Sequence, residues 1–377
     1  MSDPLVPKKL LQESDKILFL THLALGDFTY MQNCFKAFHQ EYPSLKIDLW
    51  VDEQRGKSLW RRWKRNDGKY LLYDWIESCS FINKVYKQSG SFGQTKSFLN
   101  KVKKENYSTI VSLGTLRSFN FIKLAKLISP KAFIVGVKSK TNWFNFIQNS
   151  NFKKINKSFI WQDLNPANDL HICKQYANCF KKCFGIQISE KQIFPFIDFP
   201  RKWLCYGKLK FLKWGIYNRK KSEYKKIIFI NTSAKNKRRC WSIDNSIELI
   251  QELKKLDEFY DSTFIINVLP SQKYYLKKYF NGLKNQNIFL FTADVNFFQL
   301  PSIISLCDFV ISVETSIVHL ASALKIPVIS LMRQKNPEWV PLGLKNCIIN
   351  TKKRTDWVKK ITVKDVLIKT RNFLSEL

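Results

Sequence analysis

Short apolar runs alternate with stretches of helical spacing along most of the chain. Runs of strand length are found at residues 16–23, 46–51, 107–113, 133–137, 227–231, 263–268, 308–313 and 328–332. Residues 243–256 and 317–324 have apolar positions at helical spacing, and the last helix is expected to start at Thr362 with Asp365 completing a capping box. Apolar strands that alternate with helices predict parallel sheets covered on both faces, the doubly wound α/β arrangement.

The chain length allows two such domains, because 377 residues can form two separate hydrophobic cores. A basic and aromatic stretch precedes the strand at 227–231 and is the best candidate for a linker. We therefore expect an N-terminal domain over residues 1–200, a linker over 201–223 and a C-terminal domain over 224–377.

The charge is strongly unbalanced, with 63 Lys and Arg against 30 Asp and Glu and a formal net charge of +33. Such a chain favours an anionic partner, which could be nucleic acid, a phosphorylated glycolipid or an anionic membrane surface. The nine scattered cysteines and the absence of a signal-peptide pattern indicate a reducing cytoplasm. The longest apolar region is interrupted by His319, Lys325 and Pro327, so no transmembrane helix is expected.

The stretch from 308 to 332 has the pattern strand, short polar break, helix, strand. Glu314, Thr315 and Ser316 occupy the break, where a parallel strand passes into a helix. Free backbone N–H groups and hydroxyls converge at such a place, which predicts an anion site, usually for phosphate.

Two further loops carry candidate chemistry. TSAKNKRRCW follows the strand at 227–231 and could neutralise a diphosphate leaving group, although a generic basic loop is the alternative. Its hydroxyls and cations are Thr232, Ser233, Lys235, Lys237, Arg238 and Arg239. After the first strand the chain is expected to turn sharply at Gly26-Asp27, which places Asp27 either as a helix N-cap or at the ligand-binding edge of the sheet.

Two clusters have several interpretations. The segment from Trp60 to Arg65 interleaves aromatic and cationic residues, which suits phosphate and sugar recognition, single-stranded nucleic acid or a solvated helix face. His171, Cys173, Cys179 and Cys183 lack the paired short spacings of a zinc site. We expect buried thiols on a helix there and no metal site.

The residues from Glu314, ETSIVHLASALKIP, resemble the signature of glycosyltransferase family 9, the ADP-heptose heptosyltransferases of lipopolysaccharide core synthesis, which usually reads D-T-G-x-x-H-L-A-A-A-L-G-x-P. Gly26-Asp27 resembles the family's G-D motif, GTLRS at 114–118 its acceptor-side element, and TSAKNKRRCW its hydroxyl-rich loop before a Trp. Family members tend to carry a Glu after the strand at 263–268, where this chain offers Gln272 or Lys273.

The resemblance implies the GT-B architecture, in which two Rossmann-like domains face each other across a cleft. It implies inverting, metal-independent transfer of a heptose from ADP-heptose to the inner core of lipopolysaccharide or lipooligosaccharide, with Asp27 as the general base. Arg239 or Lys237 would hold the departing diphosphate together with Thr232, Ser233, Thr315, Ser316 and His319. Glu314 would contact the donor sugar, and the acceptor would meet Arg61, Arg62, Lys64 and Arg117.

The implied acceptor is an anionic phosphorylated glycolipid, which predicts a cytoplasmic protein in peripheral contact with the inner-membrane surface. No cofactor and no nucleic acid are expected. In related enzymes the region at 142–158 covers the acceptor, so we expect a mobile or membrane-facing loop there. Three alternatives remain: a basic nucleic-acid-binding protein on a nucleotide-binding fold, a glycosyltransferase with another nucleotide-sugar donor, and a catalytically silent relative.

Overall fold

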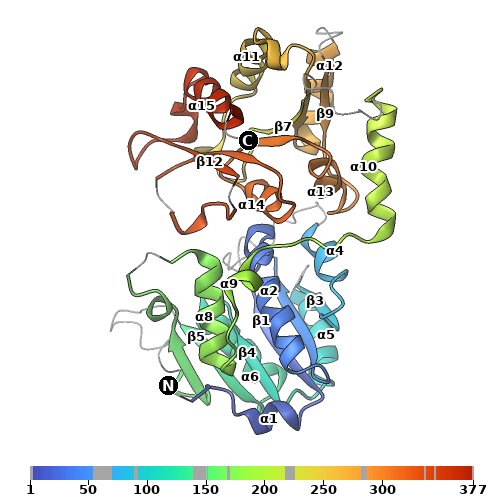
Figure 1. The fold of residues 1–377 in the computed structure, drawn as a ribbon. Coiled ribbons are helices and arrows are strands. Elements are labelled where there is room, and N and C mark those ends of the chain that lie inside the picture. The colour runs from blue at the N-terminus through green and yellow to red at the C-terminus, as the bar shows by residue number, and fades with distance from the viewer. Residues whose placement is uncertain are drawn as a thin grey trace. The chain divides into compact units, whose positions relative to one another are not determined.

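The computed structural model describes residues 3–53, 70–88, 92–138, 150, 152–167, 170–216, 226–281, 287–334, 337–343 and 345–375. For residues 88, 92–97, 278–279 and 281 the backbone alone is described. The chain forms two compact units, Met1–Ile193 and Phe194–Leu377 (Figure 1). Each unit contains one six-stranded sheet whose strands are all parallel.

The first sheet has the strand order β3-β2-β1-β4-β5-β6. Its strands are β1 Lys16–Thr21, β2 Lys46–Asp52, β3 Lys84–Gln88, β4 Thr109–Ser112, β5 Phe133–Lys138 and β6 Lys157–Ile160. The order reverses between β1 and β4, and in doubly wound sheets ligands bind outside the carboxyl ends of the strands at such a switch point.

Helices cover both faces of the first sheet (Figure 1). They are α1 Lys8–Gln12, α2 Leu25–Glu41, α4 Leu72–Ile76, α5 Phe92–Lys103, α6 Ser118–Ile128, η1 Trp161–Leu164, α8 Ile172–Phe184 and α9 Glu190–Ile193. On β1, Phe19 packs against aromatic rings of α2 and α8, while Leu18 and Leu20 join a cluster with Phe121 of α6. Because alternate side chains of a strand point to opposite faces, both faces of β1 are buried, as its apolar run predicts.

The second sheet has the order β12-β11-β10-β7-β8-β9. Its strands are β7 Ile227–Asn231, β8 Thr263–Asn267, β9 Ile288–Phe291, β10 Phe309–Val313, β11 Val328–Met332 and β12 Asn346–Asn350. Counted along its own part of the chain, this is the order of the first sheet, with the switch point between β7 and β10. The doubly wound α/β fold predicted from the sequence is confirmed in both units.

The second unit carries the remaining helices. They are α10 Arg201–Lys213, η2 Lys237–Arg239, α11 Ile243–Lys254, η3 Asp257–Phe259, α12 Pro270–Asn281, α13 Gln299–Ile304, α14 Ser316–Ala323, η4 Pro337–Trp339, η5 Val358–Lys360 and α15 Val363–Ser375. The predicted capping box is present at α15, where Asp365 N–H donates to Thr362 Oγ1 and Thr362 N–H to the Asp365 carboxylate.

The units divide between Ile193 and Phe194, and the stretch expected to be a linker begins with helix α10. The Gly207 N–H of α10 donates to Ser302 Oγ of α13, 2.8 Å away, so this part of the stretch is packed structure of the second unit. Most of the region 142–158 lies outside the described residues, and its last two residues begin β6. Within the described part of the chain, no helix is long and apolar enough to cross a bilayer.

The thiols of α8 lie in the core of the first unit. Cys173, Cys179 and Cys183 are buried, and the His171 side chain caps the helix by accepting from Cys173 N–H. Burial raises the pKa of the Cys173 thiol to about 12, and it raises the pKa of Cys183 as well. The prediction of buried thiols on a helix is therefore confirmed.

Candidate active site

A chain of polar side chains joins three strands at the switch point of the second sheet. Asn267 at the end of β8 donates through Nδ2 to Asn231 Oδ1 at the end of β7, at 2.9 Å. Asn231 Nδ2 in turn donates to Ser312 Oγ of β10 at 3.0 Å and to Thr315 Oγ1 at 3.3 Å. These bonds fix the residues that follow β7, Thr232 and Ser233, beside those that follow β10, Thr315 and Ser316.

Helix α14 starts in this polar group. Thr315 is its N-cap, with Oγ1 accepting from Ile317 N–H at 3.3 Å, and Ser316 is the first helical residue. The first-turn N–H groups and the helix dipole make this terminus favourable for an anion. His319 lies one turn inside the helix, buried, with its ring 5.9 Å from that of Trp339.

The loop from Thr232 to Trp241 is closed at its base and presents its cations outward. Trp241 N–H donates to Thr232 O at 2.9 Å, and the buried Trp241 ring is held by its Nε1–H, which donates to Ile361 O. Thr232 is buried, Ser233 is partly buried and Lys237 is exposed. This loop therefore holds a cationic turn, η2, at the C-terminal edge of the sheet.

Glu314 lies between two guanidinium groups. Its Oε2 is 3.2 Å from Arg333 Nε and its Oε1 is 3.4 Å from Arg239 Nε. The contact with Arg239 is an ion pair without hydrogen-bond alignment, since Arg239 Nε and Glu314 Oε1 are buried and have no hydrogen-bond partner. The sequence predicts that Glu314 contacts the donor sugar, which stays a prediction; the structure shows a buried carboxylate that holds two arginines at the C-terminal edge of the sheet.

Arg333 was not predicted from the sequence. It follows β11 directly and is buried, with 7% of its surface exposed. The sequence offered one signal, a cation directly after the strand predicted at 328–332. In the structure this strand is β11 and lies beside β10, so Arg333 is at the same edge of the sheet as Glu314. Since 19 residues separate the two, only the strand order brings them together.

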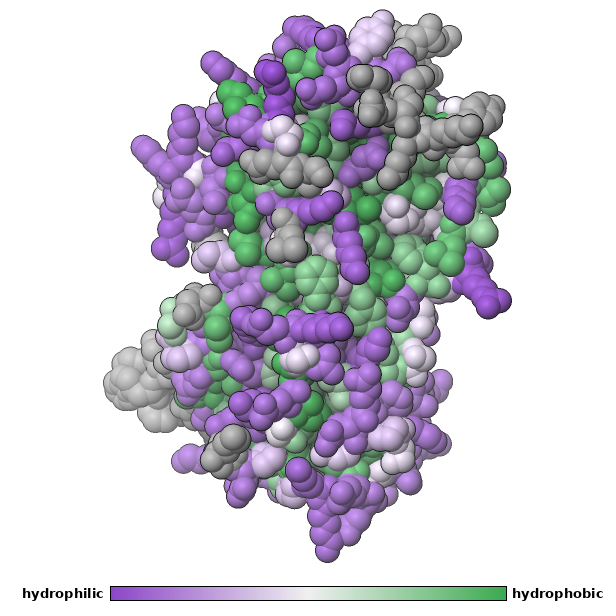
Figure 2. All heavy atoms as spheres, in the orientation of Figure 1, coloured by the Kyte–Doolittle hydropathy of each residue, from purple (hydrophilic) through white to green (hydrophobic). Residues whose placement is uncertain are grey.

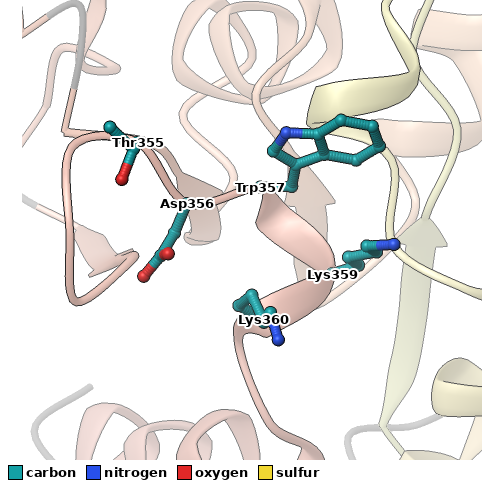
Figure 3. A pocket seen from close by; sticks show the side chains of 5 residues that line it. All are labelled: Thr355, Asp356, Trp357, Lys359 and Lys360. Atoms are coloured by element: carbon teal, nitrogen blue, oxygen red, sulfur yellow. The ribbon is translucent and has the colours of Figure 1, made fainter.

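A second unpredicted feature is an exposed tryptophan beside the cationic turn. Trp357 lies with the Arg238 guanidinium 5.8 Å from its ring centre and Lys359 Nζ 4.9 Å from it. A shallow cavity of about 230 Å³ is lined here by Thr355, Asp356, Trp357, Lys359 and Lys360 (Figure 3). The indole and its two cations extend the positively charged edge beyond η2.

Gln272 and Lys273, which stand where the family tends to carry a Glu, make contacts of their own in the structure. Gln272 Oε1 accepts from Leu269 N–H at 3.4 Å and so caps the start of α12. Lys273 Nζ lies 3.5 Å from Asp294 Oδ2. Neither side chain therefore supplies the carboxylate that the family's Glu would.

In the first unit, the Asp27 carboxylate caps the start of α2. Its Oδ2 accepts from Ala24 N–H at 2.8 Å, and its Oδ1 accepts from the Tyr176 hydroxyl at 3.1 Å. The expected sharp turn at Gly26-Asp27 is wrong, because the helix already begins at Leu25 and both residues lie within its first turn. Asp27 is only partly buried, at the end of the sheet where β1 stops.

Other polar groups lie at the switch point of the first sheet. Thr115 Oγ1, after β4, is 3.4 Å from His22 Nε2, after β1. Neither His22 nor Tyr176 was predicted as a site residue, although His22 lies within the run at 16–23 that the sequence identified as a strand and directly follows β1 in the structure. Arg117 is exposed and caps α6 in a left-handed conformation with φ 52°. Arg61, Arg62 and Lys64 lie outside the described residues.

Comparisons with known proteins agree with this geometry. The family model of glycosyltransferase family 9 (heptosyltransferase) matches residues 167–365. A search of curated protein sequences finds no match. Similar solved structures include the glycosyl transferase family 9 protein from Veillonella parvula (14% identity, TM-score 0.72, covering 97% of this chain and 99% of that one).

Two Escherichia coli structures are also similar. ADP-heptose lps heptosyltransferase II has 14% identity and a TM-score of 0.67, and heptosyltransferase WaaC with ADP has 14% identity and a TM-score of 0.61. In both cases 96% of this chain and 99% of the other chain are covered. At such low identity the likeness shows the fold, which is the GT-B fold.

Proposed function

Because this chain belongs to glycosyltransferase family 9, we propose that it transfers a heptose from ADP-heptose to the inner core of lipopolysaccharide or lipooligosaccharide. The two E. coli structures of similar fold are named as an ADP-heptose lps heptosyltransferase and as a heptosyltransferase with ADP, which supports this donor. The net charge of +33 supports an anionic, phosphorylated glycolipid as the acceptor. The proposed setting is cytoplasmic, at the surface of the inner membrane.

The observation that carries the proposal is the group of Arg239, Glu314 and Thr315 at the switch point of the second sheet. The Glu314 carboxylate holds Arg239 near the N-cap of α14, so a guanidinium and a helix N-terminus occupy the same edge. A diphosphate needs such an arrangement, because its charge grows as the bond to the sugar breaks. We propose that the diphosphate is bound by two cations and by five neighbouring polar residues. These are Arg239, Lys237, Thr232, Ser233, Thr315, Ser316 and His319.

The proposed reaction is a single displacement with inversion. A hydroxyl oxygen of the acceptor forms a bond to the anomeric carbon while the bond from that carbon to the diphosphate oxygen breaks and ADP leaves. Asp27 accepts the hydroxyl proton, since a carboxylate is ionised at neutral pH and can act as the base. The Tyr176 hydroxyl, which donates to Asp27 Oδ1, would fix the direction of the remaining lone pairs.

In this proposal the charge of the leaving group is neutralised by cationic side chains in the way that a divalent ion does in other transferases. Glu314 orients Arg239 and Arg333, and its contact with a sugar hydroxyl stays a prediction. Arg117 is assigned to the acceptor, because it is exposed at the switch point of the first sheet.

The first test is the thermal unfolding of the protein with ADP, UDP, GDP, their sugar conjugates and a short single-stranded oligonucleotide. We expect ADP and ADP-heptose to raise the midpoint, and Arg239→Gln to lose that rise while Lys364→Gln, an exposed cation of α15, keeps it. Transfer to a truncated core glycolipid, with NMR of the new anomeric centre, then tests heptose transfer and inversion. A rise of the unfolding midpoint with UDP- or GDP-sugars alone would mean that the donor is not ADP-heptose. A salt-sensitive rise with the oligonucleotide alone would favour nucleic-acid binding.

A further inference from the structure

The segment between β12 and α15, residues 351–362, is strongly basic. Its sequence, TKKRTDWVKKIT, contains five cations and one carboxylate, and all five cations are exposed. On the side of the second unit where Figure 1 shows β12 and α15, Figure 2 shows mostly hydrophilic side chains. Because η5 of this segment packs against the cationic turn η2, positive charge from two parts of the chain is concentrated here, which favours an anionic ligand.

Within this segment, Trp357 holds two cations beside an exposed indole. The Arg238 guanidinium of η2 lies 5.8 Å from the ring centre and Lys359 Nζ lies 4.9 Å from it, while 38% of Trp357 is exposed. In the described part of the chain, Arg238, Lys359 and Lys360 form no ion pair with a carboxylate. Two like charges beside one ring repel each other, so an anion that binds near both relieves this repulsion.

Hydrogen bonds fix the backbone that carries these side chains. Asp356 Oδ2 accepts from Lys353 N–H at 3.0 Å, and Asp356 N–H donates to Lys353 O at 3.0 Å. At the other end of η5, the Trp241 Nε1–H donates to Ile361 O at 2.9 Å, which ties the segment to the loop that carries Arg239. A ligand therefore meets a backbone that is already ordered, which lowers the entropic cost of binding.

The turn η2 connects this segment with the residues proposed to bind the donor diphosphate. Its adjacent residues Arg238 and Arg239 have different partners, since Arg239 lies beside Glu314 and Arg238 lies beside Trp357. One short turn thus supplies a cation to each of two neighbouring places. The place beside Trp357 contains none of the residues that we assign to the donor diphosphate.

The cavity beside these cations offers groups that suit a sugar. Figure 3 shows Thr355 and Asp356 on one side of η5, and Trp357 and Lys359 on the other. A hydroxyl and a carboxylate can exchange hydrogen bonds with sugar hydroxyls. The cavity volume of about 230 Å³ lies below the ~300–1,000 Å³ of sites for drug-sized ligands, so it suits a single sugar ring.

We propose that these residues bind a sugar that carries a phosphomonoester. We call them the Trp357 site: Arg238, Thr355, Asp356, Trp357, Lys359 and Lys360. The cations hold the phosphate, and Thr355 and Asp356 meet the hydroxyls of the ring. A phosphorylated glycolipid and a free sugar phosphate share this chemistry. The inference rests on the proposed transferase function only where the glycolipid is the source.

Other anions match the Trp357 site less well. Single-stranded nucleic acid stacks successive bases on several aromatic rings, whereas Trp357 is the one aromatic residue in 351–362 and η2. An acidic peptide would pair with the cations, but its carboxylates would repel Asp356. A sugar phosphate supplies an anion for the cations and neutral hydroxyls for Asp356.

The test is fluorine NMR of the full chain labelled with 5-fluorotryptophan, in which the Trp357 resonance is assigned by its loss in Trp357→Phe. We expect glucose 6-phosphate to shift this resonance to saturation, and glucose or inorganic phosphate to require about tenfold higher concentrations. Lys359→Gln/Lys360→Gln should weaken the binding of glucose 6-phosphate about tenfold. The matched control is Lys364→Gln/Lys369→Gln, which removes two exposed lysines of α15 and should bind as the parent does.

Steady-state kinetics of heptose transfer identify the source of the phosphate. If the glycolipid is the source, Lys359→Gln/Lys360→Gln should raise the KM for a phosphorylated core acceptor about tenfold, with the KM for ADP-heptose unchanged. The KM for the same acceptor after phosphatase treatment should hardly change. If the KM for both acceptors stays that of the parent while glucose 6-phosphate still shifts the Trp357 resonance, the ligand is a free sugar phosphate.

Three results would overturn the proposal. They are no shift of the Trp357 resonance with glucose 6-phosphate, equal weakening in the site and control variants, and a shift that only an oligonucleotide or an acidic peptide produces. The NMR titration contains neither donor nor acceptor. A chain that binds glucose 6-phosphate but transfers no heptose would therefore refute the transferase function and leave the Trp357 site standing.

Discussion

Arg333 Nε lies 3.2 Å from Glu314 Oε2, and more than nine-tenths of both side chains is buried. Two buried charges lose their hydration, and their mutual attraction offsets this cost only while both partners are present. Arg239, the other cation at Glu314, is 34% exposed. Arg333 is therefore the structural partner of the carboxylate, and Arg239 is the partner that can also reach a ligand.

Replacing Arg333 by methionine should destabilise the second unit. The variant leaves the Glu314 carboxylate buried with one unaligned cation, so we expect the free energy of unfolding to fall by about 3–5 kcal/mol. Adding Glu314→Gln should recover part of the loss, because the double variant has no unpaired buried charge. Urea denaturation of both single variants and the double variant measures this coupling, and additive losses would contradict it.

Arg239→Gln should act on catalysis more than on folding. Losing one preorganised cation at a developing charge typically lowers kcat by about 10²–10³. The exposed Lys237→Gln should lower it less, and Arg371→Gln on α15 serves as the control for lost surface charge. Steady-state kinetics at saturating donor and acceptor give kcat. A rise in KM with unchanged kcat would mean that Arg239 binds the donor equally in the ground state and the transition state.

The first unit should lose stability in acid because Glu105 is protonated there and loses its ion pairs with Lys16 and Lys84. Hydrogen bonds from Lys16 and Lys84, with Nζ–O distances of 2.6 and 2.7 Å, lower the pKa of Glu105 from 4.5 to about 2. Because the pKa of Glu105 is lower in the folded than in the unfolded protein, the ionised side chain contributes its full stabilisation of the fold above pH 4.5. This contribution is lost as the pH falls toward 2. Solvent screening limits it to about 1 kcal/mol.

We therefore expect Glu105→Gln to be less stable than the parent by this amount at pH 7 and equally stable near pH 2. Urea denaturation across this range measures the difference. Glu13→Gln is the control, because its partner Lys9 is 3.7 Å away and both side chains are largely exposed. A difference between Glu105→Gln and the parent that stays constant with pH would show that packing, and not charge, is lost.

The eight strands predicted from the sequence include all the central ones, and the four that were missed, β3, β6, β9 and β12, are the edges of the two sheets. A central strand of a doubly wound sheet is buried on both faces and leaves a continuous apolar run. An edge strand is partly solvated, and KVYKQ in β3 or KSFI in β6 lacks that run, whereas IFLF in β9 is apolar but only four residues long. Pattern alone therefore finds the centre of such a sheet and misses its borders.

The site could be predicted at the level of loops and not of contacts. Glu314 and Arg239 were placed at strand ends because their strands were recognised. Their partner Arg333 depends on β10 and β11 being neighbours, which one sequence does not show. For Asp27, its place at the start of a helix is compatible both with a residue that caps the helix and with a catalytic base. The structure shows that Asp27 caps the helix, and its role as a base stays a prediction.

Asp27→Asn separates these two roles. Asparagine keeps a side-chain oxygen for the Ala24 N–H, so the cap of α2 should be largely retained, while a neutral amide cannot accept a proton. We expect kcat to fall by about 10²–10⁴, with the unfolding midpoint and the response to ADP close to those of the parent. Asp365→Asn is the matched control, because the Asp365 carboxylate also accepts from the backbone N–H of the residue three positions before it, Thr362, at the start of α15, and lies in the other unit. Equal losses of activity in the two variants would reduce Asp27 to a cap, whereas a loss confined to Asp27→Asn supports proton transfer to this carboxylate.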